Sequence, residues 1–549
     1  MQWIESEEIW NPNSVLKWSR TILTIVVAGI ASLISGPGRA DDDPFEDLRQ
    51  RIEKLERENQ RLQSQETFRV ASNVPSAPGD AVSEGSDQTP TPAGAGSPGG
   101  QDLIQQRLSN LESMFGTMQH SLEMGVLSPT GSRSTDISPI LKTGTPTYPS
   151  AKLTGFFQMD NLNFNQSGGN QHQFGTMDNN TGFRRARLAA VGDVSQNVSY
   201  MLEMDFAFPG RPTFMDVWLD VHNIMLLGNV RAGQWRQPFG MDNLTSIREL
   251  TFLERPLSFG LAPFRQTGLG FHDTNEDITL TWASSVYGSE TDAWGNTFGN
   301  KGYGSSTRIT GIPVFEDDGK RVMHFGFDYC LTVPGPNGVI YRNTPEMGGL
   351  FGSSSSQVVP GGNTGGGISG DTPFVYNTGA LFFNQSNMFN VEYAGVLNHL
   401  HWQSELTYNV MNFGGTTACI PAAYAQAAYL LTGEVRPYNK VAGVLGRIKP
   451  LCPFGECGGM GAWEVAARYS YIDTNPVGKF GTVNAFSPAQ TGPGGVIPFG
   501  GAVNDVTMGV NWYLNTYTKV QFNYIIANVN RGGVSSVVDV LAVRAQLDF

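Results

Sequence analysis

"VLAVRAQLDF", residues 540–549, alternates strictly between two kinds of side chain. One face of this stretch is apolar and the other is mainly polar: Leu541, Val543, Ala545, Leu547 and Phe549 against Ala542, Arg544, Gln546 and Asp548. A period of two is typical of a β-strand whose two faces meet different surroundings. A soluble sandwich would usually continue into a frayed, polar terminus, so a strand that stops on Phe549 favours another class of β-protein.

The composition fits a membrane barrel better than a helical membrane protein. The chain has 549 residues, of which 15% are charged and 11% aromatic, with 66 glycines and a mean hydropathy of −0.21. It contains no run of about 20 apolar residues, which a membrane-spanning helix requires. A transmembrane barrel hides its hydrophobicity in alternation, so its average stays near that of a soluble protein. The net charge of −13 argues against a nucleic acid partner, because such binders carry a basic surface.

The same alternation recurs in short runs from about Lys152 onward, separated by clusters of Gly, Asn, Asp and Ser. Three examples are VSYMLEMDFAF (198–208), LHWQSELTYNV (400–410) and TKVQFNYII (518–526). Each places carboxylates, amides or bases on one face and mainly apolar side chains on the other. A packed soluble barrel would not enclose such groups, because unpaired buried charges are costly. We therefore predict an all-β fold, a transmembrane antiparallel β-barrel whose polar face lines water and whose apolar face meets lipid.

Residues 1–40 have the features of a secretory signal peptide. Lys17 and Arg20 precede the apolar run 22–34, and the small residue Ala40 marks the expected cleavage site. A membrane-anchoring helix is the alternative, but the apolar run is short for a span.

Two segments with heptad spacing follow, at residues 41–66 and 101–124. Their a and d positions are Leu48, Ile52, Leu55, Asn59 and Leu62 in the first segment and Ile104, Leu108, Leu111, Phe115, Met118 and Leu122 in the second. This spacing predicts a short α-helical coiled-coil stalk that promotes a trimer or dimer, with a solvated amphipathic helix as the alternative. Residues 67–100 are rich in Pro, Ser and Gly and are expected to be disordered. Residues 125–150 form a linker to the barrel at 151–549.

Several motifs resemble one known family. GFRRARLAAVGDV (182–194), VRAGQWRQPFGMDN (230–243), TFLERPLS (251–258), YLLTGEVRPYNKV (429–441), GAWEVAARYSYID (461–473) and NWYLN (511–515) occur in this order. Together they resemble the phosphate-selective porin O and P family over residues 151–549. The resemblance implies a 16-stranded antiparallel barrel, a homotrimer, and diffusion of small anions through a pore that an inward-folded loop narrows.

The resemblance also implies a location in the outer membrane, in contact with its lipid, with the N-terminal segment in the periplasm. The final Phe549 is similar to the signal that the barrel-assembly machinery reads in bacterial outer-membrane barrels. The family's namesakes concentrate Arg and Lys along the pore. Here, residues 151–549 hold 24 Lys and Arg against 30 Asp and Glu, a net charge of −6. The overall charge of the barrel therefore gives no support for phosphate selectivity, and only the local placement of bases could.

Seven arginines are candidates for binding anions along the pore. Five lie on polar faces of expected strands, and two lie in or at the end of the candidate constriction loop 242–267 with Glu254: Arg185, Arg187, Arg231, Arg468 and Arg544, and then Arg255 and Arg265. Arginine rows in a narrow channel focus the electric field and draw anions through. The alternative is that each arginine pairs with a wall carboxylate such as Glu203, Asp205, Asp216 or Asp220. A plain surface loop is likewise the alternative for 242–267.

Signals for catalysis and cofactors are weak. The sequence has no GxSxG, HExxH or GxxxxGK[ST] motif, and its seven histidines lack ligand spacing, so we expect no enzyme, no metal and no cofactor. Cys452 and Cys457 flank one short loop and could form a disulfide. Cys330 and Cys419 could pair or stay free.

Two functions remain open. The first is a porin for passive diffusion of small solutes with a preference for anions such as phosphate. The second is a structural anchor whose stalk links the barrel to a cell-wall component. A barrel hydrolase is a weaker third, because no catalytic triad is visible.

Overall fold

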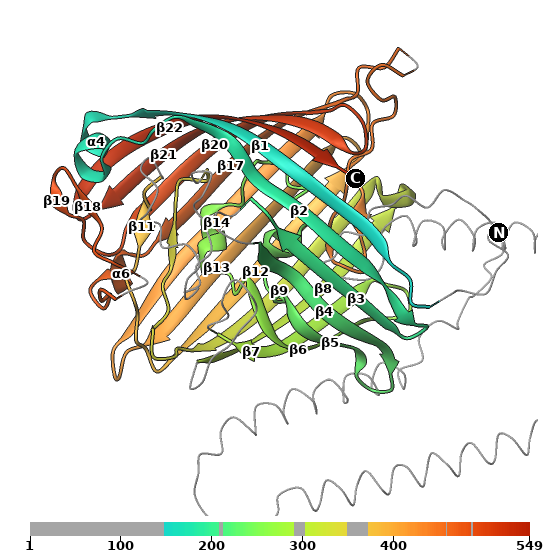
Figure 1. Cartoon of the computed structure of the whole chain (residues 1–549), viewed down its shortest axis with the longest axis horizontal. Helices are drawn as coiled ribbons and strands as arrows, with labels where there is room; N and C mark the ends of the chain where they lie inside the picture. Colours follow the sequence, from blue (N-terminus) through green and yellow to red (C-terminus); the bar gives the residue numbers. More distant parts are fainter. Residues whose placement is uncertain (1–147, 208–211, 290–301, 348–371, 457, 485–486) are drawn as a thin grey trace, which may run out of the picture. The chain divides into compact units, whose positions relative to one another are not determined.

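The computed structural model describes residues 148–207, 212–289, 302–347, 372–456, 458–484 and 487–549. The predicted signal peptide and both coiled-coil segments lie outside these residues, as does most of the linker 125–150. Sixteen strands of the described chain form one closed barrel in which every neighbouring pair is antiparallel (Figure 1). The predicted all-β, 16-stranded architecture is therefore confirmed. None of the described helices has the length and apolar character of a membrane span.

The barrel strands follow one another in chain order around the wall. Their bounds are β1 Lys152–Gln166, β2 Asn180–Ser195, β3 Val198–Asp205, β4 Thr213–Ile224, β5 Gly228–Arg236, β6 Arg265–Thr274, β7 Leu280–Gly288, β8 Tyr303–Glu316, β9 Arg321–Val333, β12 Gln385–Leu397, β13 Leu400–Asn412, β14 Thr417–Leu430, β17 Ala462–Asp473, β20 Ala502–Tyr513, β21 Thr518–Arg531 and β22 Val534–Asp548.

Short elements lie in the connections between these strands. They are α4 Gly168–Phe174, α5 Met241–Leu244, α6 Asn475–Gly478, the 3-10 helices η1 Leu257–Leu261 and η2 Asp317–Gly319, and the paired strands β10 Arg342–Asn343 with β11 Tyr376–Asn377, β15 Tyr438–Asn439 with β16 Val444–Leu445, and β18 Thr491–Gly492 with β19 Gly495–Val496.

The last strand closes the barrel against the first. β22 pairs with β1 from Phe156 opposite Asp548 to Gln166 opposite Val538. Phe549 extends this seam by one residue, since its N–H donates to the Gly155 carbonyl and its carbonyl accepts from the Gly155 N–H, both at 2.9 Å. Phe549 is about half exposed (53%). The closing residue thus belongs to the wall, and its role in assembly remains a prediction.

The predicted alternation sets the two faces of the wall. Along β13, Glu405 and Asn409 point inward and are buried, whereas Leu406 and Tyr408 point outward and are exposed. β21 and β22 follow the same scheme, with Arg544 on the inner face. The side chains therefore divide as the sequence predicted.

Long connections cluster at one end of the barrel. We call the end where β1 begins and β22 ends the terminal end, and the opposite end the far end. Most connections at the terminal end are short turns, whereas the far end carries segments 167–179, 237–264, 334–384 and 474–501. Figure 1 shows α4, α6 and the β18–β19 pair at the far end, away from the C-terminus. Segment 431–461 is the long connection at the terminal end.

The inner face is not polar throughout, which differs from the simple expectation of a water-lined wall. Val538, Val540 and Ala542 of β22 point inward and are fully buried. They belong to an apolar cluster that also contains residues from the connections, such as Leu257 and Tyr376. The reason is that connections folded into the barrel bury part of the wall, and buried wall positions favour apolar side chains.

Candidate functional site

A β-bulge in β2 brings two consecutive arginines to the inside of the barrel. Gln158 of β1 pairs with Arg185, but the next residue, Met159, pairs with Phe183, so Arg184 has no partner residue in β1. A bulge of this kind re-aims a side chain that strict alternation would send to the other face. Arg184 and Arg185 consequently both reach Glu254. Alternation alone missed Arg184, and the doubled arginine in an otherwise alternating strand was the available signal.

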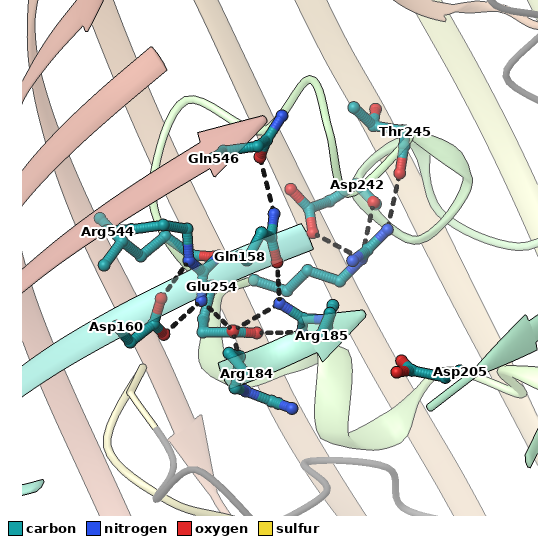
Figure 2. A network of polar contacts seen from close by, with 12 residues as sticks. Gln158, Asp160, Arg184, Arg185, Asp205, Asp242, Thr245, Glu254, Arg544 and Gln546 are labelled. Carbon is teal, nitrogen blue, oxygen red and sulfur yellow. Dashed lines mark hydrogen bonds and ion pairs between the residues drawn. The ribbon is translucent and has the colours of Figure 1, made fainter. Parts of the chain in front are cut away.

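Glu254 lies in loop 237–264 and meets three guanidinium groups (Figure 2). Arg185 binds it in a bidentate manner, with Nη1–Oε1 at 2.9 Å and Nη2–Oε2 at 2.8 Å. Arg544 Nη2 donates to Oε1 at 2.8 Å, and Arg184 Nε lies 3.2 Å from the same oxygen. We call Arg184, Arg185 and Arg544 the arginine cradle. Such charge-assisted, bidentate contacts are among the stronger hydrogen bonds in proteins.

Besides Glu254, residues of the wall also bind two arginines of the cradle, Arg185 and Arg544. Asp160 accepts from Arg544 Nε and Nη2, both at 2.7 Å. Gln158 Oε1 accepts from Arg185 Nη1 at 2.9 Å, and the Gln158 side-chain amide donates to Gln546 at 2.7 Å. These supports come from β1 and β22, on either side of the barrel seam. Two of the three cradle arginines are therefore held by wall strands, and Arg544 Nη1 also donates to the Leu253 carbonyl of the loop.

Charges around the loop shift the pKa values of its ionisable groups. Burial alone would raise the pKa of Glu254, but Arg184, Arg185 and Arg544 hold it well below its usual range. Burial raises the pKa of Asp242, and the nearby Arg255 offsets this only in part. Burial lowers the pKa of Arg255 to about 10. Glu254 is thus an anion at neutral pH, held by its basic neighbours.

Loop 237–264 is fixed to the inner wall along its length. At its start, the Gly240 N–H donates to Asp328 at 2.9 Å and the Asp242 N–H to Glu405 at 2.7 Å. Further along, the Leu250 carbonyl accepts from Lys519 Nζ at 3.1 Å. The Leu257 N–H donates to Ser470 Oγ of β17 at 2.9 Å, and its carbonyl accepts from the Tyr376 hydroxyl of β11 at 2.9 Å. These contacts place the loop inside the barrel rather than on its surface.

Each of the seven predicted arginines has a carboxylate within ion-pair distance. Their partners are Glu254 for Arg185, Asp205 and Glu203 for Arg187, Asp220 for Arg231, Asp242 for Arg255, Asp216 and Glu203 for Arg265, Glu346 for Arg468, and Asp160 and Glu254 for Arg544. Arg185 and Arg544 converge on the cradle, and Arg468 donates to the Glu254 carbonyl at 3.0 Å. Arg231 lies with Asp220 and His272 in a separate group on β4 to β6. Arg265 begins β6, just after the loop.

A second connection, 431–461, also enters the barrel, which sequence analysis did not predict. Its Arg447 contacts Glu249 of loop 237–264 and Asp548 of β22. Its Tyr438 hydroxyl lies 2.6 Å from His324 Nδ1 of β9. Connection 431–461 therefore links loop 237–264 to the wall at the terminal end.

Arg308 on β8 was also missed. Its Nε and Nη2 donate to Glu392 of β12 at 2.9 and 2.7 Å, and it also donates to the Ala442 and Gly443 carbonyls of segment 431–461 at 3.0 and 2.8 Å. The inward position of Arg308, between Ser306 and Thr310 in the alternating β8 sequence, was the available signal.

The described cysteines form no disulfide with one another. Cys330 is a buried free thiol that contacts the Tyr287 hydroxyl at 3.3 Å, and Cys419 is a free thiol next to Tyr408. Cys457 lies outside the described residues, so the predicted Cys452–Cys457 disulfide stays a prediction. In the described part of the chain, no group of three or more His, Cys, Asp or Glu side chains could hold a metal ion.

Comparisons with known proteins place the chain among porins. The family model for phosphate-selective porin O and P matches residues 152–549. Porin O of Pseudomonas aeruginosa is 25% identical over 405 residues, which cover 70% of this chain and 84% of that protein. An uncharacterized protein of Caulobacter vibrioides is 25% identical over 329 residues, or 56% of this chain and 59% of that protein.

Solved outer-membrane proteins are similar at lower sequence identity. The outer membrane channel DcaP of Acinetobacter baumannii has a TM-score of 0.40 and 11% identity, covering 74% of this chain and 99% of that one. In-vitro folded OmpT of Vibrio cholerae has a TM-score of 0.41 and 9% identity, covering 73% and 97%. Because the family match extends over the whole barrel and most of the chain, this chain belongs to the phosphate-selective porin O and P family, outer-membrane β-barrel porins that are not enzymes.

Proposed function

We propose that this porin lets small solutes diffuse passively across the outer membrane and favours small anions such as phosphate. The arginine cradle carries the proposal, because it sets three guanidinium groups against loop 237–264 inside the barrel. Bases in a narrow channel with low-dielectric walls raise the local concentration of anions.

The side chains that bind the loop from outside are mostly basic, although the barrel segment as a whole is acidic. Besides the cradle, the wall and segment 431–461 provide bases that bind the loop: Arg236, Arg436, Arg447, Arg468 and Lys519. Among the described contacts, the carboxylates from outside the loop that bind it are Asp328 and Glu405. Local placement thus favours anions although the barrel segment carries a net charge of −6.

The ion pairs limit how strong this preference should be. Every predicted arginine has a carboxylate nearby, so each base contributes less field than a free guanidinium would. We therefore expect a moderate anion preference that high salt screens.

Planar-bilayer recording tests the proposal. The purified full-length protein would be inserted into a bilayer and its reversal potential measured in gradients of potassium chloride and of potassium phosphate. A reversal potential of the sign expected for anion flow supports the proposal. A conducting barrel that prefers potassium would contradict the anion preference and leave only passive diffusion.

A structural anchor is the second candidate, and the apolar cluster inside the barrel favours it. Leu162, Leu257, Tyr376 and Val540 are fully buried in this cluster, which fills part of the interior. The coiled-coil stalk predicted from sequence would then connect a homotrimer to a cell-wall component. An anchor without a channel should give no conductance steps in the same recordings.

The stalk itself can be tested through the oligomer. If residues 48–122 hold the subunits together, a variant lacking them should dissociate at a lower temperature in detergent than the full-length protein. Equal dissociation temperatures would mean that the barrel walls alone hold the assembly.

A further inference from the structure

Glu254 occupies the arginine cradle in the way that a bound oxyanion would. Its two carboxylate oxygens receive donors from Arg185 at 2.9 and 2.8 Å, and Oε1 also meets Arg544 at 2.8 Å and Arg184 at 3.2 Å. The side chains of Arg185 and Arg544, which make the shortest contacts, are buried, with 8% and 1% of their surface exposed. A coplanar pair of oxygens in a fork of guanidinium donors is the geometry by which arginine recognises carboxylates and phosphates.

The two sides of this contact come from elements of different kinds. Arg184 and Arg185 belong to β2 and Arg544 to β22, so the donors are built into the wall. Glu254 belongs to loop 237–264, between α5 and η1. Asp160 and Gln158 bind Arg544 and Arg185 through contacts that do not involve Glu254. Withdrawal of Glu254 would therefore leave a formed site with open donors.

We propose that Glu254 is a built-in competitor for this site, and that the arginine cradle binds a small oxyanion, a carboxylate or phosphate, when Glu254 withdraws. The inference rests on the proposed anion preference and adds the residue that sets its strength. Glu254 and the solute would both present negatively charged oxygen atoms to the same arginine donors. The affinity of the channel for anions is consequently reduced by the free energy of the Glu254 contacts, which keeps binding weak enough for release.

The test compares E254Q with wild type and with E316Q. Gln keeps the size of the side chain but removes the charge that competes for the cradle. Glu316 makes the same charge change possible at an exposed site, since it pairs with Arg321 beside the η2 turn and is 53% exposed. Each protein would be recorded in a bilayer in potassium chloride while acetate or inorganic phosphate is added at constant ionic strength. The concentration that half-blocks the chloride current measures anion binding.

We expect E254Q to lower the half-blocking concentration about tenfold or more, equivalent to about 1.4 kcal/mol, with E316Q like wild type. Acetate and phosphate arms show which oxyanion fits the cradle better. An unchanged value in E254Q, or an equal change in E316Q, overturns the competitor role. Wild type without anion preference would instead contradict the proposed function, so the two failures are distinguishable.

If E254Q does not assemble, E254D provides a second variant for the same test. Asp keeps the charge but shortens the side chain by one methylene, so it reaches the cradle less well. Heat-modifiable migration shows whether each variant is folded. Folded E254D should bind acetate or phosphate more tightly than wild type, and a value equal to or weaker than wild type would overturn the proposal.

Discussion

Arg544 and Asp160 face each other directly across the seam where the last strand meets the first, and their side chains form a bidentate ion pair. Both N–O distances are 2.7 Å, and both side chains are almost fully buried. The same Arg544 also binds Glu254. One residue therefore contributes to barrel closure and to the anion site.

Neutralising Asp160 should weaken the seam. In D160N the guanidinium of Arg544 loses two charge-assisted bonds, and we expect a loss of about 1.5–3 kcal/mol in stability. Asp539 gives a matched control, because it lies in the same seam, on the partner strand β22, but faces outward, opposite Asn165 of β1. Unfolding temperatures in detergent, read from heat-modifiable migration, compare the two variants. Equal unfolding temperatures for D160N and D539N would show that the seam does not depend on this pair.

Removal of Phe549 should impair closure of the barrel. Its backbone makes two hydrogen bonds with Gly155 and its carbonyl accepts a third from the Thr154 hydroxyl at 2.8 Å. A deletion loses all three, whereas Phe549→Ala keeps them and loses only the ring. We expect the deletion to reach the periplasm but to assemble poorly, which the yield of heat-modifiable protein measures. If the yield of Phe549→Ala is as low as that of the deletion, assembly requires the ring and not the backbone pairing.

Gly155 lies at the same seam, where space for a side chain is lacking. A Cβ at this position would lie 2.5 Å from the Arg187 carbonyl oxygen and 2.6 Å from the Phe549 ring. The glycine therefore permits the close approach of β2 and of the closing residue.

The wall could be predicted from sequence because alternation is a local property. Glu203 and Asp205 point inward on β3, as the period of two required. The inward position of Arg184 could not be predicted in the same way, because a bulge changes the face without changing the composition. The partner of Arg185 could not be predicted either, since Glu254 is 69 residues away and reaches it through a loop fold.

The choice between free and paired arginines also lay beyond the sequence. Arg187 opposite Asp205 follows from strand register, which a one-residue shift would have reversed. The pair of Arg468 and Glu346 depends on where the residues just after β9 fold inside the barrel, for which the sequence has no local signal. Local pattern thus predicted the strands and left the contacts made by inward loops open.

Glu254 should make the stability of the folded protein depend on pH. Burial raises its pKa, but the larger combined effect of Arg184, Arg185 and Arg544 holds the pKa well below its usual value. A carboxyl with a lower pKa in the folded state stabilises that state above its unfolded pKa of about 4.3, and this contribution is lost as the pH falls through the folded value.

The stability difference between wild type and E254Q should therefore stay constant from about pH 8 to about pH 5 and shrink in more acidic buffer. Unfolding temperatures of both proteins across this range measure it, with E316Q as the control for charge alone. A difference that changes between about pH 6 and pH 8 would mean that another group near the cradle titrates there.

Arg187 and Asp205 decide whether the arginines act through net charge or as individual binding groups. They lie opposite each other in register, with Nε–Oδ2 at 2.8 Å, and Glu203 is a more distant partner of Arg187 at 3.7 Å. R187Q leaves one more negative charge in the barrel, D205N leaves one more positive charge, and the double variant restores the balance.

If net charge sets selectivity, R187Q should lower the anion-to-cation permeability ratio and D205N should raise it. A change of one kT per unit charge in local potential changes anion and cation partitioning each about threefold in opposite directions, so the ratio should change about sevenfold. R187Q/D205N should return to the wild-type value, and all differences should fade at high salt, because the screening length shrinks from about 30 Å at 0.01 M to about 3 Å at 1 M. Reversal potentials of the folded variants measure this. A double variant that stays as shifted as R187Q would show that Arg187 binds anions itself, so that its ion pair with Asp205 must open during permeation.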